Sequence, residues 1–155
     1  YQSLVDNFVA VYSQLVEYGY TPRVQGMAWM QGEADLGNPN GYKTLLKAFI
    51  TDIRTDLKEI TGDESLESMP FVIGEIATSF AYANNSQVPA FVTMQRAVAS
   101  EMENVYTVKT DDLIIVNADG TVNGTDQYHF NKNDSRTLGK RFGEALWNNA
   151  RRDNN

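Results

Sequence analysis

The stretch Pro70-Phe71-Val72-Ile73-Gly74-Glu75-Ile76 is the apolar run that decides the fold class. Its shortness and its β-branched residues predict a strand buried on both faces, with the proline at the first position, where a missing N–H donor is tolerated. Residues 24–29 and 105–108 form two further short runs of the same kind. Because helical patterns separate these runs, we expect right-handed β-α-β crossovers and a mainly parallel sheet covered on both faces.

Apolar residues at helical spacing predict four helices, over residues 3–18, 42–61, 88–102 and from residue 132 onward. Ser3 followed by Asp6 resembles a capping box, and Gly19 suits the position after the first helix. The polar residues 63–68 predict a loop, and residues 109–128 predict a long connection. The last helix is expected to bury four apolar side chains, those of Leu138, Phe142, Leu146 and Trp147.

The composition is that of one globular domain over residues 1–155, with 42% hydrophobic and 21% charged residues. A formal net charge of −7 argues against a nucleic-acid partner, whose binding needs clustered Lys and Arg. The chain has no cysteine, which excludes disulfides, thiolate zinc sites and a cysteine nucleophile. No apolar run approaches the roughly 18 residues of a membrane span, so we expect no membrane partner.

The only histidine ends the tetrad Asp126-Gln127-Tyr128-His129, ahead of the last predicted helix. Histidine is the side chain best suited to move protons near neutral pH, and Asp126 is placed to hold its ring in one tautomer. The alternative is a surface loop histidine whose Asp126 neighbour caps the following helix, because such short motifs often arise by chance. A metal role is disfavoured, since one histidine without cysteine cannot build a usual zinc site.

The stretch Gln31-Gly32-Glu33 follows the first predicted strand directly. The Gln31 amide can donate to an oxyanion, Gly32 permits a tight turn, and the Glu33 carboxylate can accept from a histidine N–H. The alternative is an ordinary strand exit with Glu33 in water. Ligands of parallel sheets bind where the carboxyl ends of the strands meet. We therefore expect this stretch, residues 75–80 and residues 126–129 to converge at one edge.

Glu75, at the end of the second predicted strand, admits two interpretations. It can pair with Glu33 as the two carboxylates of a glycosidase, which predicts that His129→Ala retains activity. It can instead be a partly buried acid that is bonded to the backbone or to Gln95. We favour the second interpretation.

A serine nucleophile is the part of a hydrolase site that the sequence does not offer. Such a serine needs a tight, glycine-containing turn between a strand and a helix. Ser3 opens a predicted helix, and no strand precedes it. The same context is absent around the other serines that we considered, which are Ser65, Ser68, Ser79, Ser86, Ser100 and Ser135.

The order and spacing of these motifs resemble the SGNH/GDSL-type hydrolases of the sialate O-acetylesterase and carbohydrate esterase family six group. The most specific string is Trp29-Met30-Gln31-Gly32-Glu33-Ala34-Asp35, and the second is Asp126-Gln127-Tyr128-His129-Phe130. Between them, Phe71-Val72-Ile73-Gly74-Glu75 and Gln95 occur in the same order. The likeness runs from about residue 24 to residue 142.

The resemblance implies a flavodoxin-like α/β sandwich of three layers that removes acetyl groups from sugars, such as acetyl-xylan or an acetylated sialic acid. It assigns the base to His129, the acidic partner to Asp126 or Glu33, and oxyanion or substrate contacts to Gln31 and Gly32. The implied reaction is acyl transfer through an acetyl-serine, with no metal or organic cofactor. The same resemblance favours a secreted or periplasmic location.

The chain departs from that family at the nucleophile. The family's serine lies in a Gly-Gln-Ser-Asn segment after its first strand, and the residues before Trp29 contain no such motif. Tyr1 opens a helical pattern without an initiating Met, so we expect residues 1–155 to be the C-terminal part of an esterase domain that lacks its first strand. An upstream segment or a companion chain would then supply the serine. The competing hypothesis is a non-catalytic sugar-binding or interaction domain derived from this fold.

Overall fold

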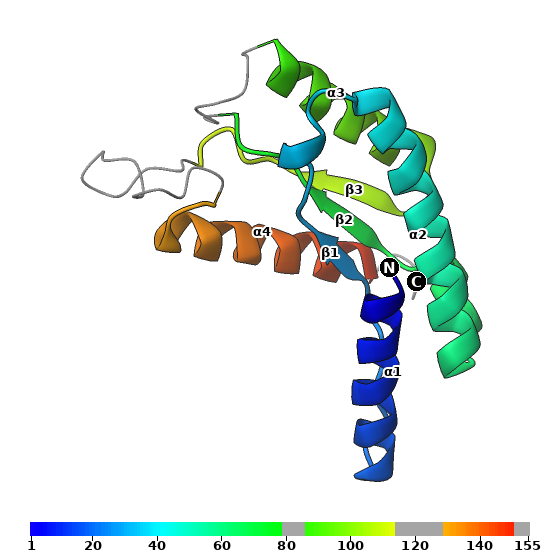
Figure 1. Cartoon of the computed structure of the whole chain (residues 1–155). Helices are drawn as coiled ribbons and strands as arrows, with labels where there is room; N and C mark the ends of the chain where they lie inside the picture. Colours follow the sequence, from blue (N-terminus) through cyan, green and yellow to red (C-terminus); the bar gives the residue numbers. More distant parts are fainter. Residues whose placement is uncertain (79–85, 114–128, 151–155) are drawn as a thin grey trace.

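The computed structural model describes residues 1–78, 86–113 and 129–150, and within them the three strands form one parallel sheet (Figure 1). The strands are β1 (Met27–Trp29), β2 (Phe71–Gly74) and β3 (Val105–Val108), in the order β1-β2-β3. Both pairs are parallel, with Phe71 opposite Met27 on one side and Val105 on the other. The predicted α/β class with a parallel sheet is confirmed.

Helices cover both faces of this sheet (Figure 1). On one face lie α2 (Pro39–Thr61) and α3 (Gln87–Glu101), which also pack against each other. On the other face lies α4 (Lys132–Ala150), which contacts all three strands. The chain is therefore a three-layer sandwich, as predicted.

The central strand β2 shows how the sequence specifies these layers. Successive side chains of a strand point to opposite faces. Phe71 and Ile73 pack into the cluster shared with α2 and α3, whereas Val72 packs into the smaller cluster with Leu138 of α4. All three strand side chains are fully buried, and burying each stabilises the fold by about 1.5–3 kcal/mol. Because helices cover both faces of the sheet, side chains on both faces of β2 must be apolar. This explains the continuous apolar run in the sequence.

Local signals predicted the ends of some helices and missed others. Gly19 and Gly62 adopt positive φ angles of 81° and 70° after the first two helices, and for Gly19 this is the position predicted. The predicted capping box at Ser3 is wrong, because α1 (Gln2–Glu17) has Tyr1 as its N-cap, and the Tyr1 side chain makes no capping hydrogen bond to the helix. The sequence pattern alone cannot choose between neighbouring starting residues.

Two segments differ from their predicted secondary structure. The expected loop at residues 63–68 contains a short 3₁₀ helix, η2 (Glu64–Ser68), because the Asp63 carboxylate accepts from the Ser65 N–H at 3.0 Å and so caps it. The first strand is shorter than residues 24–29 and covers Met27–Trp29 alone. The 114–128 part of the predicted long connection lies outside the described residues.

Two apolar surfaces remain open in this arrangement. Helix α1 projects from one end of the sandwich (Figure 1), and Val5 is its one buried residue, whereas Val11 is 59% exposed. The predicted burial of Trp147 is wrong, since this side chain is 61% exposed, while Leu138 on the same helix is buried. Among the described helices, none is both long and apolar enough to cross a membrane.

Candidate active site

The chain leaves β1 through a tight turn at Gly32. This residue is buried and has a φ angle of 147°, a conformation that side chains rarely adopt. A Cβ atom here would lie 2.7 Å from Cζ of Phe91 on α3 and 3.2 Å from Cγ2 of Ile76. Only glycine lets the strand exit pass this closely beneath α3, which bears out the tight turn expected at this position.

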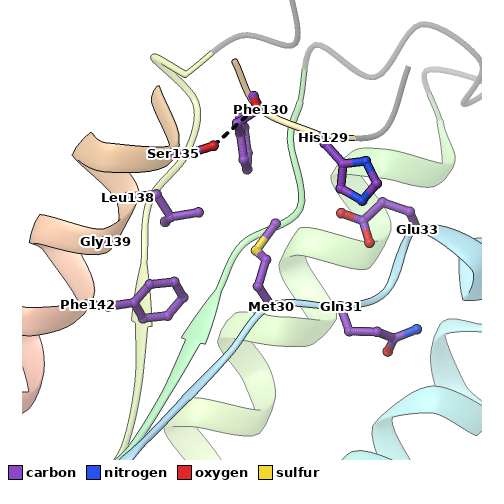
Figure 2. A pocket seen from close by; sticks show the side chains of 9 residues that line it. All are labelled: Met30, Gln31, Glu33, His129, Phe130, Ser135, Leu138, Gly139 and Phe142. Atoms are coloured by element: carbon purple, nitrogen blue, oxygen red, sulfur yellow. Dashed lines mark hydrogen bonds between the residues drawn. The ribbon is translucent and has the colours of Figure 1, made fainter. Parts of the chain in front are cut away.

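The turn leads directly into the 3₁₀ helix η1 (Glu33–Asp35), with Gly32 as its N-cap. Glu33 is therefore the first residue after the glycine, and its half-buried side chain points into a pocket (Figure 2). The geometry of Gly32 thus decides the direction in which the Glu33 carboxylate leaves the main chain.

His129 enters the same pocket from the residues just before α4. The start of α4 is capped by Asn131, whose Oδ1 accepts from the N–H groups of Asn133 and Asp134, each at 3.0 Å. Asn131 thereby fills the capping role that the alternative reading gave to Asp126. Asp126 itself lies outside the described residues, so its relation to His129 stays a prediction.

The pocket has a volume of about 470 Å³ and lies between the end of β1 and the first turns of α4. Figure 2 shows the His129 ring and the Glu33 carboxylate pointing toward one another across it. The structure therefore brings His129 together with Gln31 and Glu33, which the sequence placed at one sheet edge. We call this the His129 pocket; its lining residues are Met30, Gln31, Glu33, His129, Phe130, Ser135, Leu138, Gly139 and Phe142.

Gln31 lines the His129 pocket but directs its amide elsewhere. Its Nε2 donates to Oδ2 of Asp35 at 3.0 Å, and in Figure 2 the amide points away from His129. The short η1 helix brings the Asp35 carboxylate within reach, and a charged acceptor makes a strong hydrogen bond. In this arrangement the predicted oxyanion donor is held by Asp35.

The apolar wall of the His129 pocket depends on Gly74, at the end of β2. A Cβ atom at this position would lie 2.5 Å from Sδ of Met30 and 2.8 Å from Cζ of Phe142. The missing side chain lets Met30 and Phe142 lie over the sheet. The apolar pattern of α4 predicts that Phe142 is a core residue. That pattern does not distinguish a side chain that lines a pocket from one that packs in the core.

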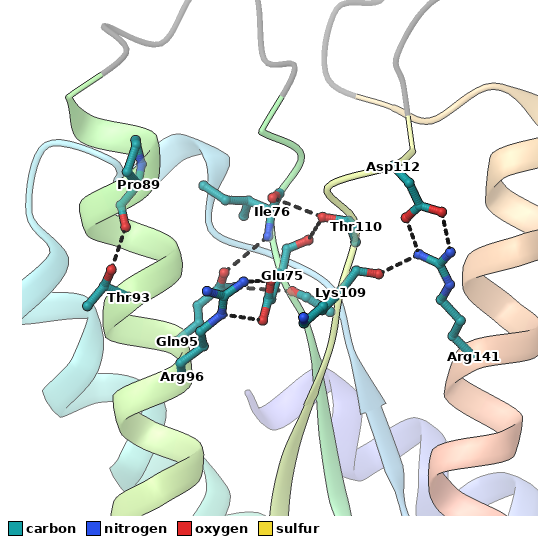
Figure 3. Close-up of polar contacts among 11 residues, drawn as sticks. Glu75, Ile76, Pro89, Thr93, Gln95, Arg96, Lys109, Thr110, Asp112 and Arg141 are labelled. Atoms are coloured by element: carbon teal, nitrogen blue, oxygen red, sulfur yellow. Dashed lines mark hydrogen bonds and ion pairs between the residues drawn. The ribbon is translucent and has the colours of Figure 1, made fainter.

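Glu75 makes a structural ion pair with Arg96 (Figure 3). Its buried carboxylate accepts from Nε and Nη2 of Arg96, both at 2.7 Å, and this hydrogen bonding raises the pKa of the Arg96 guanidinium. Glu75 does not line the His129 pocket. These contacts support the second interpretation, in which Glu75 is a structural acid. Its partner is Arg96, whereas we expected the backbone or Gln95.

Gln95 and Thr110 complete the hydrogen bonds around the end of β2 (Figure 3). Gln95 is fully buried, donates to the Gly74 carbonyl at 3.1 Å and accepts from the Ile76 N–H at 3.1 Å. The Thr110 hydroxyl lies 2.9 Å from the Glu75 carbonyl. These bonds satisfy the backbone where β2 ends, so the motif residue Gln95 has a structural role here.

A second ion pair ties α4 to the segment after β3 (Figure 3). Arg141 donates to both carboxylate oxygens of Asp112, at 2.7 and 2.5 Å, and to the Lys109 carbonyl at 2.7 Å. The hydrogen bonds from Arg141 hold the pKa of Asp112 below its ordinary value. This pair was not predicted, because its partners lie far apart in the sequence.

Ser135 lines the His129 pocket, and its hydroxyl bonds the main chain just before α4. Its Oγ donates to the Phe130 carbonyl at 3.1 Å. Within residues 1–78, 86–113 and 129–150, no three His, Cys, Asp or Glu side chains are grouped as metal ligands. The described chemistry of the pocket is therefore a carboxylate, an imidazole and an amide beside an apolar wall.

Comparison with known proteins adds one match. A family model described as carbohydrate esterase, sialic acid-specific acetylesterase, matches residues 1–148. No curated protein and no solved structure matches the chain significantly. The matched residues include β1, the Gln31-Gly32-Glu33 turn, His129 and nearly all of α4.

Proposed function

Because the chain belongs to the carbohydrate esterase family of sialic acid-specific acetylesterases, we propose that it forms the proton-transfer half of an O-acetylesterase site. The observation that carries the proposal is that Glu33 and His129 line one pocket and point toward one another (Figure 2). A carboxylate facing an imidazole is the arrangement that a serine hydrolase uses to orient its base.

In the proposed mechanism, His129 removes the proton from a serine hydroxyl as the serine oxygen attacks the acetyl carbonyl of the sugar ester. Collapse of the tetrahedral intermediate breaks the ester bond, and the proton passes from His129 to the departing sugar oxygen. Water then attacks the acetyl-serine with His129 again as the base. The proton passes from His129 to the departing serine oxygen, which restores the serine and releases acetate. Glu33 or Asp126 stabilises the positively charged imidazole in both halves.

The negative charge that develops on the carbonyl oxygen needs hydrogen-bond donors. Gln31 is the proposed side-chain donor, and in that role its amide exchanges Asp35 for the substrate oxygen. The apolar wall of Met30, Leu138 and Phe142 gives the uncharged part of an acetyl ester a place away from water. Acetyl-xylan and acetylated sialic acids are the substrate classes that we propose.

We place the serine outside residues 1–155, on an upstream segment or a companion chain. Ser135 supports this placement, because its hydroxyl bonds the Phe130 carbonyl and it lies within a helix, without a strand–turn–helix context. On this proposal residues 1–155 are the C-terminal part of one esterase domain.

A non-catalytic sugar-binding role is the second candidate. It is favoured by one observation, the Gln31 amide that is held by Asp35 and points away from His129. A pocket with an apolar wall and polar groups on one side can bind an acetylated sugar without cleaving it.

The two candidates are separated by sequencing the gene upstream of Tyr1 and assaying both lengths of protein. We expect a strand followed by Gly-Gln-Ser-Asn, aryl acetate hydrolysis by the extended protein, and none by residues 1–155. Robust hydrolysis by purified residues 1–155 would contradict the external serine. Binding of acetylated sugar by an extended protein that lacks hydrolysis would favour the second candidate.

A further inference from the structure

The phenol of Tyr42 joins α2 to the exit of β1. Its side chain is 8% exposed, and its hydroxyl lies between two groups of the candidate site. The indole Nε1 of Trp29 donates to the Tyr42 oxygen at 3.1 Å, and the Tyr42 hydroxyl donates to the main-chain carbonyl of Gln31 at 3.0 Å. The three residues form one chain of hydrogen bonds that ends at the peptide before Gly32.

The direction of this chain follows from its members. An indole N–H can only donate and a carbonyl can only accept, so the phenol must use its single hydrogen toward Gln31. Burial raises the pKa of Tyr42 to about 12, which keeps that hydrogen in place at neutral pH. The phenol therefore donates to the Gln31 carbonyl while it accepts from the Trp29 indole.

Tyr42 also supports the turn from its other side, through Phe91. The two rings are 4.9 Å apart with an interplanar angle of 53°, and Phe91 is the ring that fills the space beside Gly32. The same side chain thus holds the carbonyl before the glycine and the ring that packs against the glycine. Glycine has the largest conformational freedom of any residue, so a glycine turn needs such restraints to keep one geometry.

We propose that Tyr42 is a positioning residue that fixes the Gln31-Gly32-Glu33 turn and thereby keeps the Glu33 carboxylate directed at His129. The inference rests on the proposed function, in which Glu33 and His129 act together. Tyr42 does not line the His129 pocket and acts through the main chain of the turn.

Tyr106 on β3 provides a matched control. It is a half-buried tyrosine whose hydroxyl makes one side-chain hydrogen bond, to Oδ1 of Asn104 at 3.1 Å, and like Tyr42 it does not line the pocket. Tyr42→Phe and Tyr106→Phe each delete one hydroxyl and keep the ring. A merely structural role of Tyr42 predicts that both variants lose stability and that neither alters the surroundings of His129.

The experiment uses residues 1–155 with labelled histidine, because His129 is the only histidine and its ring resonances need no assignment. Spectra are compared at one pH for the wild type and for Glu33→Gln, Tyr42→Phe and Tyr106→Phe. We expect Glu33→Gln to shift the His129 ring resonances, Tyr42→Phe to shift them in the same direction by a smaller amount, and Tyr106→Phe to leave them in place.

Each outcome separates the two proposals. A wild-type His129 spectrum in Tyr42→Phe, with a shifted spectrum in Glu33→Gln, overturns the positioning role and leaves the Glu33–His129 pair intact. A wild-type spectrum in Glu33→Gln overturns the pair on which the proposed function depends. If Tyr42→Phe does not fold, Trp29→Phe tests the same chain of bonds, because it removes the donor to the Tyr42 oxygen.

Discussion

Glu33 and His129 line one pocket and point toward one another across it, although one follows β1 and the other precedes α4 (Figure 2). Two packing features bring them there. Gly32 lets the chain turn beneath α3, and the Asn131 cap begins α4 beside the sheet edge. The chemistry proposed for the pocket therefore depends on the packing of this turn and of this helix cap as well as on the two groups that move protons.

Gly32→Ala should destabilise the fold by about 3 kcal/mol or more, because its Cβ combines a rarely adopted φ angle with overlap of the Phe91 ring. Gly62→Ala is the control, since Gly62 also has a positive φ angle but has no atom within 4 Å of its Cβ position. That variant should lose roughly 1–2 kcal/mol. Urea unfolding measures both values, and equal losses would show that Phe91 does not constrain the turn.

Glu75→Gln and Glu33→Gln should separate the two carboxylates. Glu75→Gln loses the ion pair with Arg96, and because that guanidinium is 51% exposed we expect a loss of only about 1–2 kcal/mol of stability. Glu33→Gln should change stability by less than roughly 0.5 kcal/mol and should instead lower the esterase activity of the extended enzyme. Thermal unfolding and acetate release measure the two effects. The reverse assignment of effects would revive a catalytic role for Glu75.

Alkaline pH should weaken the fold through Tyr42. Burial raises its pKa from 10.0 to about 12, so the protonated phenol stabilises the folded state fully below pH 10 and this contribution is lost as the pH rises through about 12. By pH 11.5 the loss should reach about 2 kcal/mol. Urea unfolding between pH 9 and pH 11.5 measures it.

The control for this titration is the same pH series on Tyr42→Phe. The other groups that titrate at high pH are common to Tyr42→Phe and the wild type, so the difference between these two proteins isolates Tyr42. We expect the shallower pH dependence in Tyr42→Phe. An identical slope in Tyr42→Phe and the wild type would contradict the buried, proton-donating phenol.

Ser135→Ala should leave the activity of the extended enzyme within about threefold of the wild type. Its hydroxyl bonds the Phe130 carbonyl, so its loss should lower stability by roughly 0.5–1.5 kcal/mol. Acetate release and thermal unfolding, compared in the same preparation, measure both quantities. Loss of all activity with normal stability would identify Ser135 as the nucleophile and would remove the need for an external serine.

The layers of the fold could be predicted from the sequence because their signals are local. The buried run of β2 and the apolar stripes of α2 and α3 each carry their own periodicity. The exposure of Trp147 could not be predicted in this way. Periodicity shows which residues share a face of a helix, and it does not show whether anything packs on that face.

The site was predictable in part for the same reason. The end of a strand and the start of a helix are local features, so Gln31-Gly32-Glu33 and His129 could be placed at one sheet edge before the structure was known. The Arg96–Glu75 and Arg141–Asp112 ion pairs could not, because each joins elements whose separation is set by packing. The engagement of Gln31 with Asp35 depends on a rotamer, which no sequence pattern specifies.

The central claim is that His129 is the base of an acetylesterase, and kcat/KM of His129→Ala in the extended enzyme tests it most directly. With an aryl acetate and an acetylated sugar as substrates, we predict a fall of roughly a thousandfold or more relative to the wild type, at unchanged folding stability. A His129→Ala enzyme that keeps kcat/KM within tenfold of the wild type would contradict the assignment of His129 as the base.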